Sequence, residues 1–254
     1  VMLGHGSTSG HAGRLYRAGT EPVVLTKGLG LSTIQTHLRS KLTNVAGDSD
    51  SDGGEEGMYS LGLSMIDNSL FTQSLDFYRA DAALAVVFIS DENDICAIYP
   101  AGVTPVVDPD GKEATANPRD CTNVTPENLY RALKFRKGEK PLLVSSIIYT
   151  TNAPAGGENE IGYGYKEITE LSQGLKVDMA GDIPGGLASI GALANSQLNL
   201  ITKHLIKQPG SISKMVVLVD NQSSPFNFDA SIREVQLSSP GSAGSRVDIN
   251  YCIQ

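Results

Sequence analysis

The order of hydrophobic and polar residues along the chain predicts helices that alternate with buried strands. Residues 84–89, with the sequence LAVVFI, form a continuous apolar run between polar residues. Such a run is typical of a strand that is buried on both faces of a parallel sheet. Two further stretches, 142–149 and 175–179, are predicted to be strands of the same kind.

Apolar residues also recur at helical spacing in several segments before, between and after these strands. The predicted helices are residues 31–42, 58–66, 126–135, 165–173 and 187–205. Short β-branched segments at 1–3 and 23–26 are predicted to be strands. Because helices alternate with buried strands, the sequence predicts an α/β fold with a doubly wound, mostly parallel sheet and helices on both faces.

The pattern changes after residue 208. Residues 214–220, 231–238 and 246–253 alternate apolar and polar side chains, and turn clusters rich in Ser, Pro, Gly and Asn separate them. Alternation without intervening helices predicts antiparallel strands. We therefore expect an α/β domain at 1–208, with a loop insertion at 96–121, and a small β-strand appendage at 209–254.

Composition narrows the classes of function. The 254 residues are 40% hydrophobic and 19% charged, which is typical of a globular protein, and their net charge is −8. An acidic chain argues against a nucleic-acid-binding surface, which needs a basic face. No apolar run reaches the roughly 18 residues of a membrane span, so none is predicted. The start at Val1, inside an apolar run, indicates a processed or incomplete N-terminus, and any targeting signal would precede it.

Two acidic residues closely follow the predicted central strand. In the segment Ser90-Asp-Glu-Asn-Asp94, Asp91 and Asp94 lie at the carboxyl end of the strand, where open α/β sheets bind ligands. Carboxylate oxygens on a short loop suit a hard cation. The alternative interpretation is an acidic turn in contact with solvent.

A second acidic segment precedes the predicted helix at 58–66. It reads Asp52-Gly-Gly-Glu-Glu56-Gly-Met, and Glu56 lies 35 positions before Asp91. Together the two segments resemble the von Willebrand factor A (vWA) family, in the large bacterial branch whose central strand ends in Ser-Asp-Glu-x-Asp. The resemblance covers about residues 1–205. It implies a metal-ion-dependent adhesion site, in which Mg²⁺ or a similar cation is held at the carboxyl edge of the sheet.

In that family the site is built by an Asp-x-Ser-x-Ser loop after the first strand, a Thr before a later helix and an Asp after the central strand. Asp91 matches the last of these, and Glu56 stands where the Thr would be, so a carboxylate replaces a hydroxyl. The Asp-x-Ser-x-Ser loop is not in this sequence, and its nearest relative, His5-Gly-Ser-Thr-Ser9, has His in place of Asp. We interpret that segment as the end of the second strand, which puts the first strand upstream of Val1.

The predicted metal ligands are therefore Asp91, Glu56, Asp94 and Asp52. The predicted cofactor is Mg²⁺, with Mn²⁺ or Ca²⁺ as alternatives. A separate acidic turn, formed by Asp108, Asp110 and Glu113, could hold calcium, and a solvated turn is the alternative.

The three cysteines do not have the spacing of a zinc site. Cys96 and Cys121 bracket the polar insertion, and a disulfide between them would close a loop of 25 positions and stabilise the fold by about 3 kcal/mol. The alternative is two buried thiols in a reducing compartment. Cys252, in the predicted last strand, has no partner in this interpretation, and a partner upstream of Val1 stays open.

The leading hypothesis is a non-enzymatic, extracytoplasmic binding protein, located at the cell surface, in the periplasm or secreted. The family resemblance implies that a carboxylate of the ligand completes the coordination of the metal. The alternative is a structural component of a surface assembly, with a degenerate, metal-free site. No enzyme is predicted, since the sequence has no credible pair of nucleophile and base.

The expected partner is another protein or a further copy of this chain. It would bind at the carboxyl edge of the sheet, at the insertion 96–121 or at the β appendage. The insertion is more apolar than a merely solvated loop, with Tyr99, Val103 and Val107 among its residues. It is predicted to cover the metal edge or to form a partner interface, and the alternative is a loop packed flat on its own domain.

Overall fold

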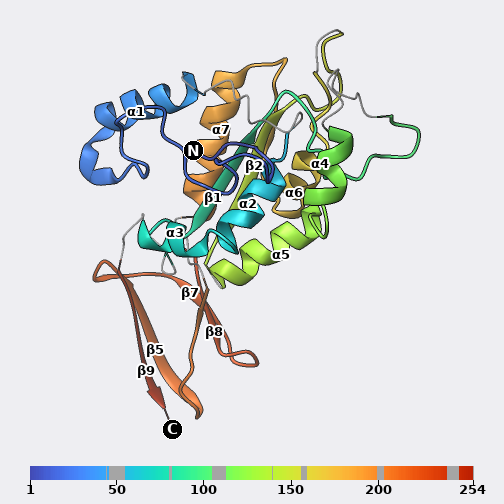
Figure 1. Cartoon of the computed structure of the whole chain (residues 1–254). Coiled ribbons are helices and arrows are strands. Elements are labelled where there is room, and N and C mark those ends of the chain that lie inside the picture. Colours follow the sequence, from blue (N-terminus) through green and yellow to red (C-terminus); the bar gives the residue numbers. More distant parts are fainter. Residues whose placement is uncertain are drawn as a thin grey trace. The chain divides into compact units, whose positions relative to one another are not determined.

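The computed structural model describes residues 1–43, 45, 55–79, 82–104, 113–138, 140–155, 159–198, 203–238 and 246–253, without the side chains of residues 113, 197 and 198. The chain forms two compact units, Val1–Ile190 (unit 1) and Gly191–Gln254 (unit 2), whose elements are labelled in Figure 1. The boundary that the sequence predicts between residues 208 and 209 stays a prediction.

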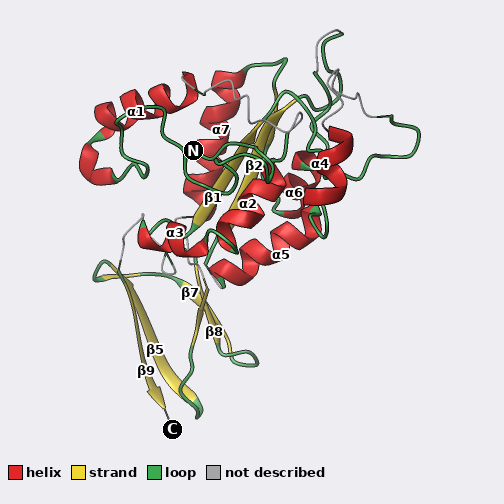
Figure 2. Cartoon of the chain, viewed as in Figure 1, coloured by secondary structure: helices red, strands yellow, loops and turns green. Residues whose placement is uncertain are grey.

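Unit 1 combines helices with one three-stranded sheet (Figure 2). Its helices are η1 (Lys27–Leu29), α1 (Leu31–Thr43), α2 (Gly57–Met65), α3 (Ser69–Ser74), α4 (Glu113–Asp120), α5 (Pro126–Lys137), α6 (Tyr165–Leu171) and α7 (Ile183–Leu198), the last of which begins in this unit. Its strands are β1 (Leu84–Ile89), β2 (Leu142–Ile148) and β3 (Lys176–Asp178).

The sheet of unit 1 is parallel, with the strand order β1-β2-β3. The register pairs Leu84 with Leu142 in the first two strands, and Ser146 with Lys176 in the second two. Because the strands are parallel, their carboxyl ends lie at one edge of the sheet, and Asp91 follows β1 at that edge. The prediction of an α/β fold with a parallel sheet is thus confirmed.

Helices pack against both faces of β2, whose seven residues are all buried. On one face, apolar residues of α2, α5 and α6 form the main core with side chains of β1 and β2. The largest fully buried members of this core are Met58, Leu133, Val144, Ile148, Tyr165 and Ile168. On the other face, Ile147 of β2 and Val177 of β3 pack with Ile183 and Ile190 of α7.

Strand β1 differs from β2, and here the prediction of burial on both faces is wrong. Ala85, Val87 and Ile89 are exposed, Val87 by 39% and Ile89 by 56%. Among the residues that the structure describes, β1 pairs with β2 alone, so it is an edge strand. A continuous apolar run indicates a strand whose two faces both favour burial. It does not indicate whether other residues of the same unit pack on both faces.

The start of α5 agrees with its predicted capping signals. Thr125 is the N-cap residue, and its hydroxyl oxygen accepts a hydrogen bond from the backbone N–H of Asn128 at 3.2 Å. Pro126 is the first helical residue, where its missing N–H costs nothing. By contrast, α4 lies inside a segment that was predicted to be a polar loop. Its sequence, EATANPRD, has little apolar periodicity and contains a proline.

Unit 2 consists mainly of antiparallel strands, as the alternating pattern predicts. The strands are β4 (Lys203–Leu205), β5 (Ile212–Val219), β6 (Gln222–Ser223), β7 (Phe226–Asp229), β8 (Glu234–Leu237) and β9 (Val247–Ile253). They form two three-stranded sheets, ordered β4-β8-β7 and β6-β5-β9. Side chains from both sheets form one hydrophobic core, in which Val217 and Val235 are the most deeply buried residues.

Two local predictions are wrong. Residues 1–3 and 23–26 form no strand, although Met2 makes an isolated bridge with Leu15. Residues 203–205, predicted as the end of a long helix, form β4 instead. Apolar spacing over so few residues does not distinguish a strand from a helix. In the described part of the chain, no helix has both the length and the apolar character to cross a membrane.

Candidate functional site

Asp94 holds the N-terminus of α2. Its side chain is completely buried, and Oδ2 accepts a hydrogen bond from the backbone N–H of Met58 at 2.8 Å. Oδ1 accepts from the N–H of Cys96 at 2.9 Å. The first N–H groups of a helix have no partner within the helix, and a carboxylate there also interacts favourably with the helix dipole. Asp94 therefore joins the loop after β1 to the start of α2.

Burial changes the acidity of this carboxyl group. Removal from water is the largest effect and raises the pKa of Asp94 from 3.8 to about 6. The N–H groups of Met58 and Cys96 and the hydroxyl of Tyr165 stabilise the charged form and oppose this effect. The loop is fixed further by the backbone, because the N–H of Ile95 donates to the carbonyl of Glu55 at 3.0 Å.

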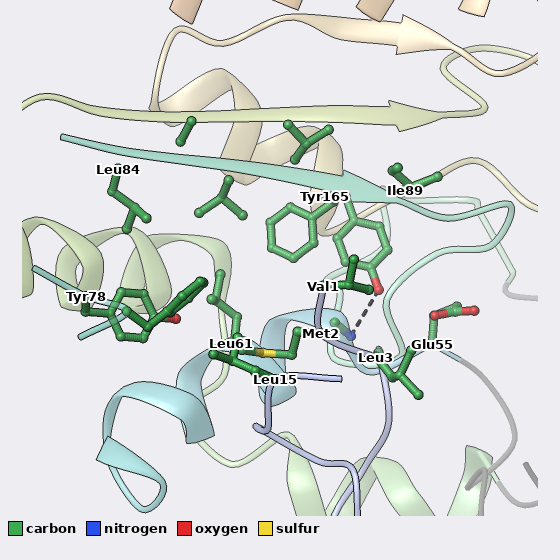
Figure 3. A pocket seen from close by; sticks show the side chains of 17 residues that line it. Val1, Met2, Leu3, Leu15, Glu55, Leu61, Tyr78, Leu84, Ile89 and Tyr165 are labelled. Carbon is green, nitrogen blue, oxygen red and sulfur yellow. Dashed lines mark hydrogen bonds between the residues drawn. The ribbon is translucent and has the colours of Figure 1, made fainter. Parts of the chain in front are cut away.

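Tyr165, the first residue of α6, completes this contact, and no motif in the sequence indicated a functional role for it. The ring is buried and stacks on Phe88 at 4.8 Å between centroids. Its hydroxyl accepts a hydrogen bond from the N–H of Gly57 at 3.1 Å, the dashed line in Figure 3. Burial, followed by the charge of Asp94, raises the pKa of Tyr165 well above its ordinary value. A Cβ on Gly57 would meet the Tyr165 hydroxyl oxygen at 2.8 Å, so this approach requires glycine in the Glu-Glu-Gly motif.

A second acidic pair lies beside the N-cap position of α2. Glu56 is completely buried, and its carboxyl group affects the pKa of Asp120, the last residue of α4. The N–H of Ser7 donates to Asp120 Oδ2 at 2.9 Å, and Arg119 pairs with the same oxygen at 2.8 Å. The segment His5–Ser9, the start of α2 and the end of α4 therefore converge at Asp120.

The environment of Asp120 keeps it charged. Burial alone would raise the pKa of Asp120, but hydrogen bonds from Arg119 and Ser7, with a smaller contribution from Glu56, outweigh burial and lower the pKa to about 2. The nearby phenol of Tyr59 responds in the opposite way, because burial and then the charges of Asp120 and Glu56 raise its pKa. Neither Ser7 nor Asp120 was among the predicted site residues, since only the unpredicted helix α4 brings them together.

Asp91 stands apart from these contacts. Its side chain is exposed just after β1, and its backbone carbonyl accepts a hydrogen bond from the N–H of Glu160 at 2.9 Å. In the described part of the chain, no three His, Cys, Asp or Glu side chains come together as a metal-binding group. Asp52, Asp108 and Asp110 and the side chain of Glu113 lie outside the described residues. The metal ligands and the calcium turn stay predictions.

The predicted disulfide is present. The sulfur atoms of Cys96 and Cys121 are 2.05 Å apart, and the bond joins the loop after Asp94 to the residue that follows α4. It therefore holds Asp94, two residues before Cys96, and Asp120, directly before Cys121, in one part of unit 1. The two sides also share a hydrogen bond from the Asn117 amide to the carbonyl of Ile95. Cys252 is a free, exposed thiol.

The structure describes residues 96–104 and 113–121 of the predicted insertion 96–121. Cys96 and Ala97 are buried and Ala116 packs in the main core, whereas Ile98 is exposed. The two ends of the insertion thus belong to unit 1 itself. The central residues 105–112 lie outside the described residues, so a partner interface formed by them stays a prediction.

Comparisons of the chain with protein-family models, with curated proteins and with solved structures found no match. The resemblance to the vWA family therefore rests on the two acidic segments quoted above.

Proposed function

We propose that this chain is a non-enzymatic, extracytoplasmic component of a protein assembly, in which a vWA-like domain binds a protein partner without a metal ion. The observation that carries the proposal is exposed apolar surface on α1. Leu31, Leu38 and Leu42 are 72, 40 and 48% exposed. Their spacing of seven and four residues puts them on one side of the helix. Several exposed apolar side chains on one side of a helix are typical of a surface that binds another protein.

The orientation of α1 is fixed by a polar contact. Lys41 is buried, and its Nζ donates to the backbone carbonyl of Tyr16 at 2.6 Å. Burial lowers the pKa of Lys41, and the charge of Glu21 opposes this effect. A buried lysine is costly unless its partners are in place, so rotating the leucines inward would require breaking this contact. This supports an interpretation in which the exposed apolar side of α1 is a stable feature of unit 1.

The acidic residues support the metal-free version of the proposal. Both oxygens of Asp94 accept hydrogen bonds from backbone N–H groups. This predicted ligand thus has a role in the fold that needs no cation. The parallel sheet, with α2, α5 and α6 on one face and α7 on the other, supports a doubly wound, vWA-like arrangement. The disulfide supports an extracytoplasmic location, because such bonds persist in oxidising compartments.

The second candidate is a metal-dependent adhesion protein. Asp91 favours it, since its exposed carboxylate follows a parallel strand at the carboxyl edge of the sheet. A hard cation held there by few protein oxygens would be open to a carboxylate of the partner. In this version Asp52 and Asp91 would hold Mg²⁺, Mn²⁺ or Ca²⁺, while Asp94 and Glu56 would support them.

Calorimetric titration of the whole chain with Mg²⁺, Mn²⁺ and Ca²⁺ separates the two candidates. The assembly component is expected to give no saturable heat, and Asp91→Ala should behave as the unchanged protein does. Binding near one ion per chain that Asp91→Ala abolishes would contradict the metal-free proposal and favour the adhesion protein. Asp178→Ala is a suitable control, because Asp178 lies at the end of β3, and its pKa is lowered mainly by the hydroxyl of Thr150.

A further inference from the structure

A cavity in unit 1 lies between α2 and α5, two helices that pack side by side (Figure 1). Its volume of about 380 Å³ falls within the roughly 300–1,000 Å³ of typical small-molecule sites. The described lining comes from within residues 58–67, 120–124 and 128–132, so α2, the loop between α4 and α5 and the start of α5 enclose it. None of these lining residues belongs to a strand, so a further strand of the sheet beside β1 would not form part of the cavity.

The loop on one side of the cavity is held in place by covalent and polar contacts. Its first residue, Cys121, is linked to Cys96, and the backbone N–H of Val124 donates to the carbonyl of Cys121 at 3.1 Å. The side-chain amide of Asn128 donates to the carbonyl of Asn123 at 3.0 Å, which joins the loop to α5. A cavity whose walls are already ordered loses little conformational entropy when a ligand binds.

The most deeply buried part of the lining is apolar. Met58 and Leu129 lie there, and both are buried members of the main core. Gly62, in the middle of α2, lines the cavity without a side chain, and an added Cβ would meet Leu129 at an ordinary 3.9 Å. Ile66 also lines the cavity and is 69% exposed. These surfaces would be covered by the apolar part of a small molecule.

The charged part of the lining is acidic. Asp67 and Asp120 are the charged residues among the described ones that line the cavity. Asp67 is exposed, and in the described part of the chain its carboxylate has no ion-pair partner. Asp120 is paired with Arg119, which is not among the lining residues. Because the whole chain also has a net charge of −8, the cavity is expected to attract cations and to repel anions.

Tyr59 adds an aromatic surface to the lining. Burial, followed by the charges of Asp120, Glu56 and Asp67, raises the pKa of its hydroxyl. The phenol is therefore uncharged at neutral pH, and the negative charges act on the space beside it. A protonated amine is attracted to the face of an aromatic ring within about 6 Å. A cation near Tyr59 would thus gain from the ring as well as from Asp67.

We infer that this cavity binds a small organic cation with one protonated amine on a compact apolar body. The apolar body covers Met58 and Leu129, and the amine lies near Asp67 and Tyr59. A neutral or anionic molecule of similar shape makes the same apolar contacts but lacks the electrostatic attraction, so the cavity selects its ligand by charge. No residue of α1 is among the described residues that line the cavity, so this site goes beyond the protein contact proposed above and does not depend on it.

The test uses three probes of similar shape: 2-phenylethylamine, which is protonated at neutral pH, uncharged 2-phenylethanol and anionic phenylacetate. Each is titrated into the whole, isotopically labelled chain, and binding is followed by the shifts of backbone amide signals in nuclear magnetic resonance. The amine should bind saturably and shift the signals of residues 59–67 and 120–132. The alcohol should bind about tenfold more weakly, because it lacks the ion pair and the cation–π contact, and the anion should not bind measurably.

Gly62→Leu is the variant that blocks the cavity. Leucine favours a helix, and its side chain would occupy the space beside Leu129, so binding of the amine should weaken by about tenfold or more. Circular dichroism checks that this variant is folded. If it is not, the charge variants described next decide the matter, because they change exposed residues only.

Asp67→Asn is the variant that removes the charge. It should weaken binding of the amine by about threefold, the effect of an exposed ion pair, and leave binding of the alcohol unchanged. Glu127→Gln is the matched control, because the exposed side chain of Glu127 on α5 is not among those that line the cavity. It removes the same charge and should leave binding of the amine unchanged.

Several results would overturn the inference. No saturable binding of the amine, or equal binding of the amine and the alcohol, would show that the cavity does not select a cation. Unchanged binding of the amine by folded Gly62→Leu, or shifts confined to other parts of the chain, would place the ligand elsewhere. An equal loss in Asp67→Asn and Glu127→Gln would indicate only a general attraction to an acidic protein. The metal titration uses other ligands and Asp91→Ala, so a failure here would leave the proposed function untouched.

Discussion

The carboxylate of Asp94 accepts a hydrogen bond from the backbone N–H of Met58, 36 residues earlier in the chain. This contact joins the two acidic segments on which the family resemblance depends. It also explains why a carboxylate is buried there, because the start of α2 supplies the N–H group that compensates it. The sequence therefore predicted the proximity of the two segments correctly, while the chemistry observed between them is that of a helix cap.

The pH dependence of stability should reveal Asp94. Its pKa in the folded protein, about 6, is above the ordinary value of 3.8, so folding favours the protonated form. The stabilisation is complete below about pH 4 and is lost as the pH rises through 6, by roughly 3 kcal/mol. Urea unfolding between pH 4 and 7 measures this change as the difference between the unchanged protein and Asp94→Asn. A difference that stays constant over this range would contradict the raised pKa.

Asp120 should act in the opposite direction and in a lower pH range. Its folded pKa of about 2 is below the ordinary 3.8, so its contribution is present above about pH 4 and is lost as the pH falls toward 2. Asp120→Asn should therefore unfold more easily at pH 5 and differ progressively less from the unchanged protein in acid. Urea unfolding at pH 5, 4, 3 and 2.5 provides the comparison. If the difference in unfolding free energy between the two proteins grows as the pH falls, the lowered pKa of Asp120 is contradicted.

Gly57→Ala should destabilise unit 1. The added Cβ would come within 2.8 Å of the Tyr165 hydroxyl oxygen, and overpacking of this kind typically costs about 1–3 kcal/mol. Gly62→Ala is the matched control in the same helix, since its Cβ would meet Leu129 at an ordinary 3.9 Å. Alanine favours the helix, so the control should be stabilised by up to about 1 kcal/mol. Thermal unfolding that ranks the two variants the other way would disprove the close approach.

The disulfide should contribute to stability, while the third cysteine should not. Replacing Cys96 and Cys121 together by Ser opens a link across 25 positions and should cost about 3 kcal/mol. Cys252→Ser should leave the free energy of unfolding unchanged, because that thiol is free and exposed. Peptide mapping without reductant identifies the linked cysteines directly. Free thiols at both positions, or an equal effect of all three replacements, would contradict the pairing.

The sequence predicted the elements with strong periodicity and missed those without it. The apolar runs of β1 and β2 and the capping residues Thr125 and Pro126 were sufficient to define their elements. Helix α4 has no such pattern, so the meeting of Ser7 with Asp120 could not be foreseen. The same limit applies to the site, because acidic residues near a strand end are equally compatible with binding a cation and with capping a helix. Only the positions of neighbouring N–H groups distinguish the two.

The hydrogen bond from Ser7 to Asp120 spans 113 residues of the chain. Closing so long a segment costs more conformational entropy than forming the local helices, and contacts of this range slow folding. During synthesis, which proceeds from the N-terminus, the segment His5–Ser9 exists long before its acceptor does. We therefore expect this segment to dock late, after α4 has formed and the nearby disulfide has brought Asp120 to the start of α2. Oxidation would then set the rate at which the segment His5–Ser9 reaches its final position.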